Sequence, residues 1–270
     1  MTAKASTLRC ENLFEIKSPF VELPSNLREV YGSEPNAHTA EAVAELNKQT
    51  LENLENYKPV QSGKRAAEIT YQEANRLHQS MHNHRVVGYN ATANYNRPDV
   101  SIGYCFGRAT YAHLMLLKMG MQKESVLKIW AVGEMKSPSV MWDFHVATLV
   151  NTAQHGWMAI DPNFSNPTTV SEWVQKYKST STDQLLRFYV TPAEKFSFEI
   201  GKYDRAQLGL DMERKADWYR HYFVDLIKSV RETKIDNLSA QQFNPKNDSI
   251  KEETKLSQAV DYLKRFLGLR

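Results

Sequence analysis

Apolar residues return at helical spacing in three stretches of the first half of the chain. After Thr39, a residue type that caps helix N-termini, a roughly helical stripe is formed by Ala42, Val43, Leu46, Leu51 and Leu54. Thr70 is followed three residues later by Glu73, which is the arrangement of a capping box, so a second helix is predicted there. A third stretch covers 105–120 and ends in a Met-Gly pair that favours a helix C-terminus.

The spacing then changes to short runs of β-branched and aromatic residues, which predict strands. These runs cover 126–134, 144–150, 157–160 and 186–190. Helical spacing returns near the C-terminus, over 204–228 and 250–267. Because helices flank one block of strands and do not alternate with single strands, the order predicts an α+β fold and not a repeated βαβ unit.

The same pattern predicts three parts of the chain. Residues 1–65 form an N-terminal arm and helix, and the arm (1–36) is expected to be irregular because Pro and Gly punctuate it. This part is expected either to cover a cleft or to dock a partner. Residues 66–200 form the core, and 201–270 form helices that pack on it.

Charge and composition narrow the class of partner. The chain is 41% hydrophobic and 24% charged, which is ordinary for a folded globular protein. Its 34 basic residues are interleaved with 31 acidic ones, so it has no basic footprint for nucleic acid. No apolar run is long enough to cross a bilayer. Neither nucleic acid nor a membrane is therefore expected as a partner.

Two cysteines, Cys10 and Cys105, are too few for a disulfide framework or a zinc site of several thiolates. The first 20 residues lack the apolar core of a secretory signal. We expect a protein that acts in the cytosol or is exported by a route that needs no such signal.

Three residues stand where nucleophilic catalysis would need them. Cys105 starts a predicted helix, where free N–H groups and the helix dipole stabilise a thiolate and can hold an oxyanion. His145 lies in a predicted strand, and Asp161 follows the next strand directly. If the two strands are adjacent and antiparallel, Asp161 can accept the imidazole N–H and orient a general base.

Each of the three also has a structural explanation. A cysteine at a helix start is often a small buried apolar residue. A histidine in an apolar strand is often part of the core, and an aspartate before a proline often belongs to a turn. Found together in this order, the three residues favour a catalytic triad with no metal or organic cofactor.

Three strings that contain these residues resemble the bacterial protein glutaminases. They are GYCFGRATYAHLMLLKMG at 103–120, WDFHVATLV at 142–150 and WMAIDPNF at 157–164, within a region of similarity over about 70–175. The resemblance implies a papain-like, transglutaminase-like core in which a nucleophile helix packs on an antiparallel sheet. It also implies deamidation of protein-bound glutamine, with Cys105 as nucleophile, His145 as base and Asp161 as orienting acid. Bacterial effectors that deamidate host proteins share this triad and fold.

The strings mark three further residues, which would either bind substrate or anchor the helix. These are Tyr104, Arg108 and Trp142. Arg108 lies about one turn after Cys105, and for it we favour the anchoring role.

Other activities use the same triad. A transglutaminase or a cysteine peptidase differs only in the acyl acceptor or the bond cleaved. An arylamine N-acetyltransferase also has a Gly-Tyr-Cys-Phe-like string, but Ser101-Ile102-Gly103 stands here in place of its Arg-Gly-Gly. An inactive binding module of the same fold is a fourth alternative. The presence of all three triad residues argues against it.

Two groups of residues outside these strings are expected to be structural. His78, His82 and His84 lie near a helix end, where we expect a solvated surface and not a metal site, because no HExxH string accompanies them. Trp218, Tyr222, Leu226 and Val230 form a stripe at helical spacing, which predicts packing against the core or a partner.

Overall fold

A computed structural model of the chain describes residues 39–59, 65–89, 91, 95, 104–138, 141–196, 217–235 and 238. The expected arm over 1–36 and the expected helix over 250–267 lie outside these residues. So does the 204–216 part of the helix expected over 204–228. None of the described helices is long and apolar enough to span a membrane.

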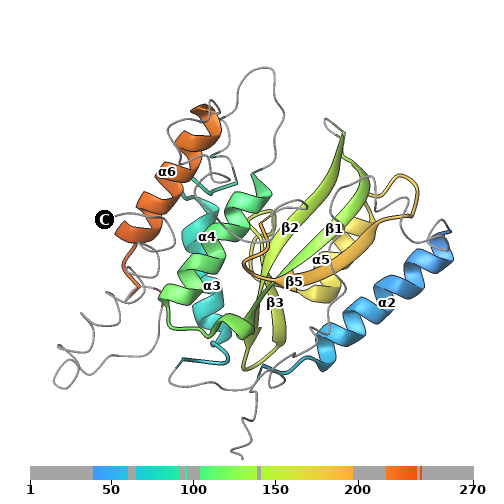
Figure 1. Cartoon of the computed structure of the whole chain (residues 1–270), viewed down its shortest axis with the longest axis horizontal. Helices are drawn as coiled ribbons and strands as arrows, with labels where there is room; N and C mark the ends of the chain where they lie inside the picture. The colour runs from blue at the N-terminus through green and yellow to red at the C-terminus, as the bar shows by residue number, and fades with distance from the viewer. Residues whose placement is uncertain are drawn as a thin grey trace, which may run out of the picture.

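An antiparallel sheet of five strands forms the centre of the described structure (Figure 1). Its order is β4-β3-β2-β1-β5. The strands are β1 (Val126–Lys136), β2 (Met141–Thr152), β3 (Gly156–Ile160), β4 (Thr168–Thr169) and β5 (Arg187–Pro192). The four predicted strands are confirmed as β1, β2, β3 and β5. The prediction missed β4, because two residues are too few to show a period.

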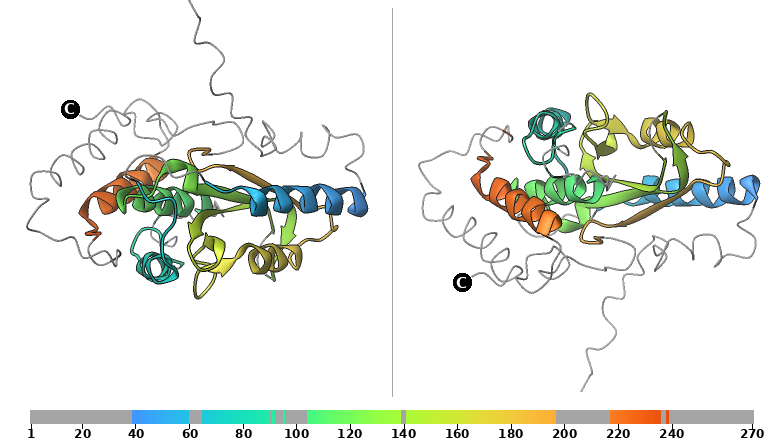
Figure 2. Two further views of the ribbon diagram at one scale, coloured as in Figure 1. Left: turned by 90° about the horizontal axis from the view of Figure 1, so that it is seen from below. Right: turned by 90° about the horizontal axis from the view of Figure 1, so that it is seen from above.

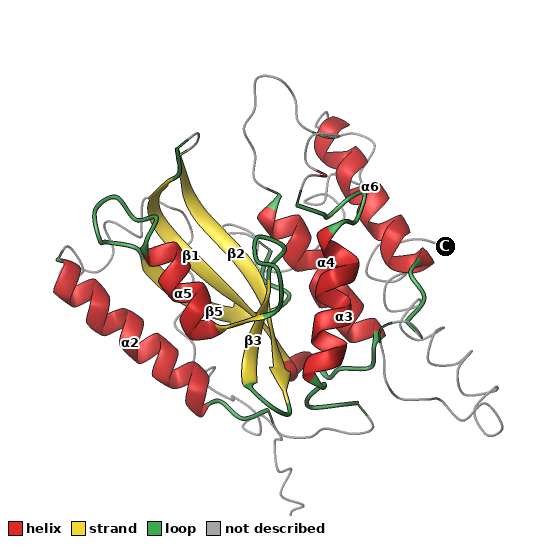
Figure 3. Cartoon of the chain, turned by 180° about the vertical axis from the view of Figure 1, so that it is seen from behind, coloured by secondary structure: helices red, strands yellow, loops and turns green. Residues whose placement is uncertain are grey.

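Helices cover both faces of the sheet. They are α2 (Ala40–Asn56), α3 (Tyr71–His82), α4 (Cys105–Lys118), α5 (Val170–Lys178) and α6 (Asp217–Glu232), with a short 3-10 turn over Lys123–Ser125. Helix α4 packs on β2, α6 packs on α4, and α3 lies beside α4 (Figures 1 and 2). The view from behind shows α5 in front of the sheet (Figure 3). The mixed helical and antiparallel-sheet class is as predicted.

The predicted helix starts are confirmed by their caps. The Thr39 hydroxyl accepts the Ala42 N–H at 3.2 Å. At the start of α3, the Thr70 hydroxyl accepts the Glu73 N–H at 3.2 Å, while the Glu73 carboxylate accepts the Thr70 N–H at 2.8 Å. This reciprocal pair satisfies two N–H groups that the helix leaves free, so local sequence alone fixes where α3 begins.

Two hydrophobic clusters lie on opposite faces of the sheet, because successive strand residues point to opposite sides. On β1, Trp130 and Val132 belong to the cluster with α4 and α6, whereas Ile129 and Ala131 belong to the cluster with α5. The central strands are thus buried on both faces. This burial fixes their register, since a slip of one residue would exchange the two faces.

Helix α2 is attached to the edge strand β5 by the buried side chains of Asn47 and Thr50, the second of which accepts a guanidinium N–H of Arg187 at 3.0 Å. The Asn47 amide oxygen accepts the Phe188 N–H at 2.8 Å and a guanidinium N–H of Arg187 at 3.0 Å. The amide nitrogen donates to the Leu186 carbonyl at 2.8 Å. The helix in the first predicted part therefore packs on the sheet of the second, while the boundaries at 65 and 200 stay a prediction.

Helix α6 lies against the outer side of α4. The stripe of Tyr222, Leu226 and Val230 is buried there, which confirms the predicted packing; the Trp218 side chain is outside the described set. The Lys118 ammonium, near the end of α4, donates to the carbonyls of Val230 and Thr233, each at 2.8 Å. At the other end the two helices meet through the Tyr222 ring and Gly107.

Replacement of Gly107 by alanine is predicted to destabilise this contact. A Cβ there would lie 2.3 Å from the Tyr222 hydroxyl oxygen and from its Cε1 atom. We expect Gly107→Ala to lower the free energy of unfolding by about 1–3 kcal/mol in a urea titration, the usual cost of overpacking. In a Tyr222→Leu background Gly107→Ala should instead raise the free energy of unfolding, because alanine stabilises a helix by about 1 kcal/mol relative to glycine. Equal destabilisation in both backgrounds would contradict the proposed clash.

Candidate active site

Cys105 is the first residue of α4 and lies on the side of the helix that faces the sheet. The first backbone bond of this turn is the Arg108 N–H to the Tyr104 carbonyl at 2.9 Å. The N–H of Cys105 therefore precedes the hydrogen-bonded ladder and has no acceptor within the helix. The side chain is buried. The predicted helix start is confirmed, and the thiol lies beside the positive end of the helix dipole.

His145 lies on β2, just beyond the point where β3 ends. The pairing of β2 with β3 runs from Thr148–Ile160 to Thr152–Gly156. Position 145 is paired on its other side with Ala131 of β1. The edge of β2 beside His145 is therefore open, which leaves room for side chains from the loop after β3.

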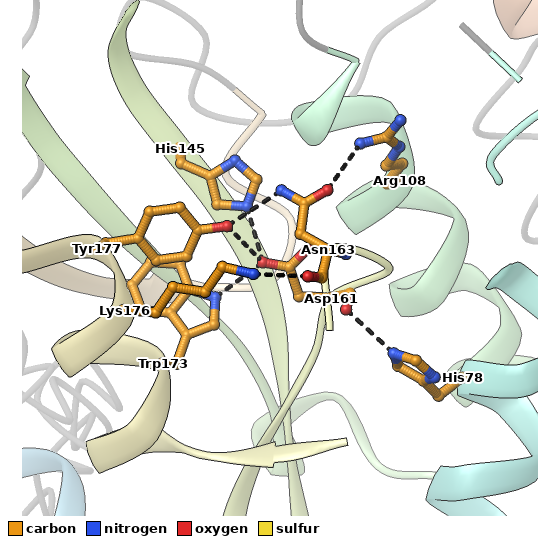
Figure 4. Close-up of polar contacts among 8 residues, drawn as sticks. All are labelled: His78, Arg108, His145, Asp161, Asn163, Trp173, Lys176 and Tyr177. Atoms are coloured by element: carbon orange, nitrogen blue, oxygen red, sulfur yellow. Dashed lines mark hydrogen bonds and ion pairs between the residues drawn. The ribbon is translucent and has the colours of Figure 1, made fainter. Parts of the chain in front are cut away.

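Asp161 follows β3 and is hydrogen-bonded to His145. The distance from His145 Nε2 to Asp161 Oδ2 is 2.8 Å (Figure 4). The two side chains are 8% and 2% exposed, so the pair is shielded from water. The predicted adjacency of the histidine strand and the aspartate strand holds in the structure. Cys105 contributes to the raised pKa of His145, so the thiol lies near the ring, and because Nε2 bonds Asp161 the ring nitrogen left to face the thiol is Nδ1.

Two aromatic side chains of α5 complete the surroundings of the carboxylate. Trp173 Nε1 and the Tyr177 hydroxyl donate to the same Asp161 oxygen, at 2.9 Å and 3.0 Å. The Asn163 backbone N–H donates to the other oxygen at 3.0 Å. The carboxylate thus accepts four hydrogen bonds, one of them from His145, which compensate for its burial.

The same helix also holds the imidazole ring. The Tyr177 ring stacks on His145 with centroids 4.5 Å apart and planes 21° apart. Trp173 lies on it at 5.9 Å and 28°. Helix α5 therefore fixes both the acid and the base of the predicted set.

The pKa values of the pair move in opposite directions. Burial lowers the pKa of His145, but the charge of Asp161 and hydrogen bonds to Asp161 and Cys105 outweigh burial and raise it to about 9. Burial raises the pKa of Asp161, but the charge and hydrogen bond of His145, followed by the bonds from Asn163 and Trp173, hold it well below its usual range. At neutral pH the pair is an imidazolium and a carboxylate.

The expectation of a solvated histidine cluster is wrong for His78. This residue is fully buried, and its Nε2 lies 3.0 Å from the Asp161 backbone carbonyl. Burial lowers the pKa of His78, so the neutral ring donates to that carbonyl. Its side chain points inward from α3, because the helix packs against the turn after β3. His82 stacks beside it at 6.2 Å. Within the described residues, no cluster of His, Cys, Asp and Glu side chains has the arrangement of a metal site.

The three residues marked beside the triad lie in different places. Arg108 donates to the carbonyls of Gly88 and Tyr89 at 3.2 Å and 3.1 Å. Its other nitrogen lies 3.4 Å from the Asn163 amide oxygen. These bonds anchor α4, the role favoured from the sequence.

Tyr104 and Trp142 pack on opposite sides of the sheet. The Tyr104 ring packs against Tyr222 of α6 with centroids 4.4 Å apart and planes tilted by 36°. Trp142 is half-buried on the hydrophobic cluster of the α5 face. Both positions are structural contacts in the described state, and a role in substrate binding stays a prediction.

The sequence interpretation missed α5 and the residues that it brings to Asp161. Its signals were present: Thr169 and Glu172 form a capping box, and Trp173 and Tyr177 are four residues apart, on one helix face. Asn163 was missed because no local pattern shows that its side chain joins two elements. The structure thus brings Cys105, His145 and Asp161 together and adds Trp173, Tyr177 and His78.

A family model described as glutaminase (Gln_deamidase_2) matches residues 74–177. This segment begins in α3, ends in α5 and contains the whole of the site above. No curated protein matches the chain.

Two solved structures are similar at 19% identity. One is the protein-glutaminase of Chryseobacterium proteolyticum, with a TM-score of 0.37 over 66% of this chain and 95% of that one. The other is the A47Q2 mutant of a pro-protein-glutaminase, with a TM-score of 0.41 over 72% of this chain and 67% of that one.

The raised pKa of His145 predicts a loss of stability in alkali. Below the unfolded value of 6.5 both states hold the proton, so the stabilisation is fully present. Above it the unfolded state loses the proton first, and stability falls until the pH passes about 9. In urea titrations between pH 6.5 and about 9, the free energy of unfolding of the wild type should fall relative to that of His145→Gln. The fall should be on the order of 3 kcal/mol at most, because one pKa unit corresponds to about 1.4 kcal/mol. The exposed His155→Gln variant is the control, and it should follow wild type; a parallel course of all three proteins would contradict the shift.

Proposed function

We propose, from the premise that residues 74–177 are a segment of the glutaminase family, that the protein hydrolyses the side-chain amide of protein-bound glutamine. The products are glutamate and ammonia. The observation that carries the proposal is the pairing of His145 with a buried, ionised Asp161 at the N-terminus of the helix that carries Cys105.

The first step is acylation of Cys105. Its thiolate attacks the carboxamide carbon, and the developing oxyanion is stabilised by the Cys105 N–H, which has no acceptor within the helix. The His145 imidazolium donates its Nδ1 proton to the departing nitrogen. The C–N bond breaks, ammonia leaves, and a thioester joins Cys105 to the substrate side chain.

The second step is hydrolysis of the thioester. The neutral His145 now takes a proton from water through Nδ1, and the hydroxide equivalent adds to the thioester carbon. Collapse of this intermediate breaks the C–S bond, which restores the thiolate and releases glutamate. The imidazolium is regenerated, so one amide and one water give one carboxylic acid and one ammonia.

Asp161 acts on His145 in both steps. Its carboxylate accepts the Nε2–H at 2.8 Å, which keeps Nδ1 directed toward the sulfur and stabilises the imidazolium. The order of a nucleophile helix, a histidine strand and an aspartate at the end of the next strand also supports a papain-like, transglutaminase-like core.

The acyl acceptor separates this proposal from its rivals. A transglutaminase would pass the thioester to a lysine amine, a peptidase would cleave the main chain, and an acetyltransferase would modify arylamines. Intact-mass spectrometry of a glutamine-rich substrate protein, with and without an added primary amine, distinguishes them, because deamidation adds about 1 Da per site while the others join, shorten or acetylate molecules.

Replacement of Cys105 by alanine is predicted to abolish ammonia release. No other side chain of the site can form the thioester, so the loss should be complete within the detection limit of a coupled ammonia assay. The control is Cys10→Ala, which leaves Cys105 in place and should retain wild-type activity. Ammonia release by Cys105→Ala at the wild-type rate would remove Cys105 from the mechanism.

Replacement of Asp161 by asparagine should keep the fold and reduce the rate severely. An amide favours the wrong imidazole tautomer and cannot stabilise the imidazolium, and the corresponding change in a serine triad costs about 10⁴-fold in kcat. We expect a loss of roughly 10³-fold or more, measured as kcat for ammonia release. Asp143→Asn, on the exposed part of the same strand as His145, is the matched control and should leave kcat unchanged. A wild-type rate for Asp161→Asn would refute the orienting role.

A further inference from the structure

We propose that Arg108, Asn163 and Tyr177 form a directional chain of hydrogen bonds that keeps the Nε2 proton of His145 on the side of Asp161 throughout the reaction. The three are positioning residues, and the proposal rests on the deamidase function proposed above. Asn163 and Tyr177 were not marked by the sequence, and Arg108 was marked only as an anchor or a substrate contact.

The chain runs from the nucleophile helix to the acid in three bonds (Figure 4). Arg108 donates to the Asn163 amide oxygen at 3.4 Å. The Asn163 amide nitrogen donates to the Tyr177 hydroxyl oxygen at 3.1 Å. The Tyr177 hydroxyl donates to Asp161 Oδ2 at 3.0 Å, beside the bond from His145 at 2.8 Å.

Arg108 sets the direction of this chain. A guanidinium can only donate, so the oxygen end of the Asn163 amide must face it and the NH₂ end must face Tyr177. The Tyr177 oxygen then accepts from Asn163, which leaves its single O–H to donate to Asp161. With the amide reversed, two donors would face each other at Arg108.

The last bond of this hydrogen-bond chain determines which nitrogen of His145 keeps its proton. Asp161 Oδ2 receives three donors, from Tyr177, Trp173 and Nε2 of His145. Because three donors point at this oxygen, the Asp161 carboxylate stays ionised, and the oxygen can accept only from a ring nitrogen that carries a hydrogen. After His145 gives up one proton during acylation, the proton that remains is therefore held on Nε2. Nδ1 is then free to accept a proton from water.

The hydrogen-bond chain begins near Cys105, at Arg108, and ends at Asp161, so both of its ends lie at the same catalytic centre. Arg108 is three residues from Cys105, is 9% exposed and is held by the carbonyls of Gly88 and Tyr89. The Asn163 backbone is fixed at both ends: its N–H donates to Asp161 Oδ1 at 3.0 Å, and its carbonyl accepts the Lys176 ammonium at 2.6 Å. The nucleophile helix and the acid are thus linked through the side chains of Asn163 and Tyr177.

A purely mechanical link between α4 and the loop after β3 is the competing explanation, and Asn163→Asp separates the two. A carboxylate at 163 would pair with Arg108 at least as strongly as the amide does, so it preserves the link. It cannot donate to Tyr177, and it attracts the Tyr177 O–H away from Asp161. The direction of the chain is lost while its connection is kept.

We expect Asn163→Asp to lower kcat for ammonia release about ten- to a hundredfold, the rate equivalent of one hydrogen bond to a charged group, with KM unchanged. We also expect the pKa of His145 to rise above its wild-type value, because Asp161 loses a donor and a second negative charge is added nearby. The pKa is measured by NMR titration of labelled imidazole carbons, with the His145 signal assigned from a His145→Ala sample.

Two controls and a double variant complete the test. Asn151→Asp changes an amide of β2 that bonds the Ala67 carbonyl, and Arg65→Lys changes a guanidinium that bonds the Met121 carbonyl near the other end of α4. Both should leave kcat and the His145 titration as in wild type. In a Tyr177→Phe background, Asn163→Asp should have little further effect on kcat, because the bond that it redirects is already absent.

A wild-type kcat together with an unshifted His145 titration in Asn163→Asp would overturn the proposal, as would full additivity with Tyr177→Phe. If Asn163→Asp does not fold, the NMR titration of Tyr177→Phe tests the proposal alone. The pKa of His145 should again rise, because Asp161 loses the same donor, and an unshifted pKa would overturn the proposal. The titration needs no substrate, so the two proposals fail separately. A shifted titration in a protein that deamidates no glutamine refutes only the function. A wild-type rate of deamidation together with an unshifted His145 titration refutes only the hydrogen-bond chain.

Discussion

A buried negative charge is the constraint on which this structure depends. Asp161 is 2% exposed, and an ionised carboxylate is costly in such surroundings unless donors surround it. The donors come from β2, from α5 and from the loop that follows β3, and His78 of α3 holds the backbone of the same residue. Four segments must therefore be in place before this charge is stable, and once they are, His145 has one orientation.

The open edge of the sheet explains how groups from opposite faces meet. Helix α4 packs on one face and α5 on the other, so a continuous β3 would separate the nucleophile from the acid. Because β3 ends at Ile160, the loop after it brings Asp161 beside His145, while α4 presents Cys105 to the same ring. The segment 74–177, which matches the family model described as glutaminase, spans α3 to α5 and so includes each of these parts.

Elements outside that segment support it from both sides. Helix α2 is bonded through Asn47 to β5, which pairs with β1 of the segment, and α6 packs on α4 through Tyr222 and Gly107. The second contact lies two residues from the nucleophile, so the position of the helix start depends on a helix more than 100 residues later in the chain. Substitutions in α6 are for this reason expected to affect the site without touching it.

The sequence by itself determined the elements whose signals are local. The caps of Thr39 and Thr70 and the apolar runs of four strands predicted helices and strands correctly, because capping and side-chain alternation depend on neighbours in the chain. The order of Cys105, His145 and Asp161 gave the candidate triad for the same reason. Only the tertiary structure decided that His78 is buried against Asp161, that Trp173 and Tyr177 donate to it, and that Asn163 joins it to Arg108. These contacts link segments 12 to 83 residues apart, and such pairings are set by the packing of helices on the sheet, which no short stretch of sequence specifies.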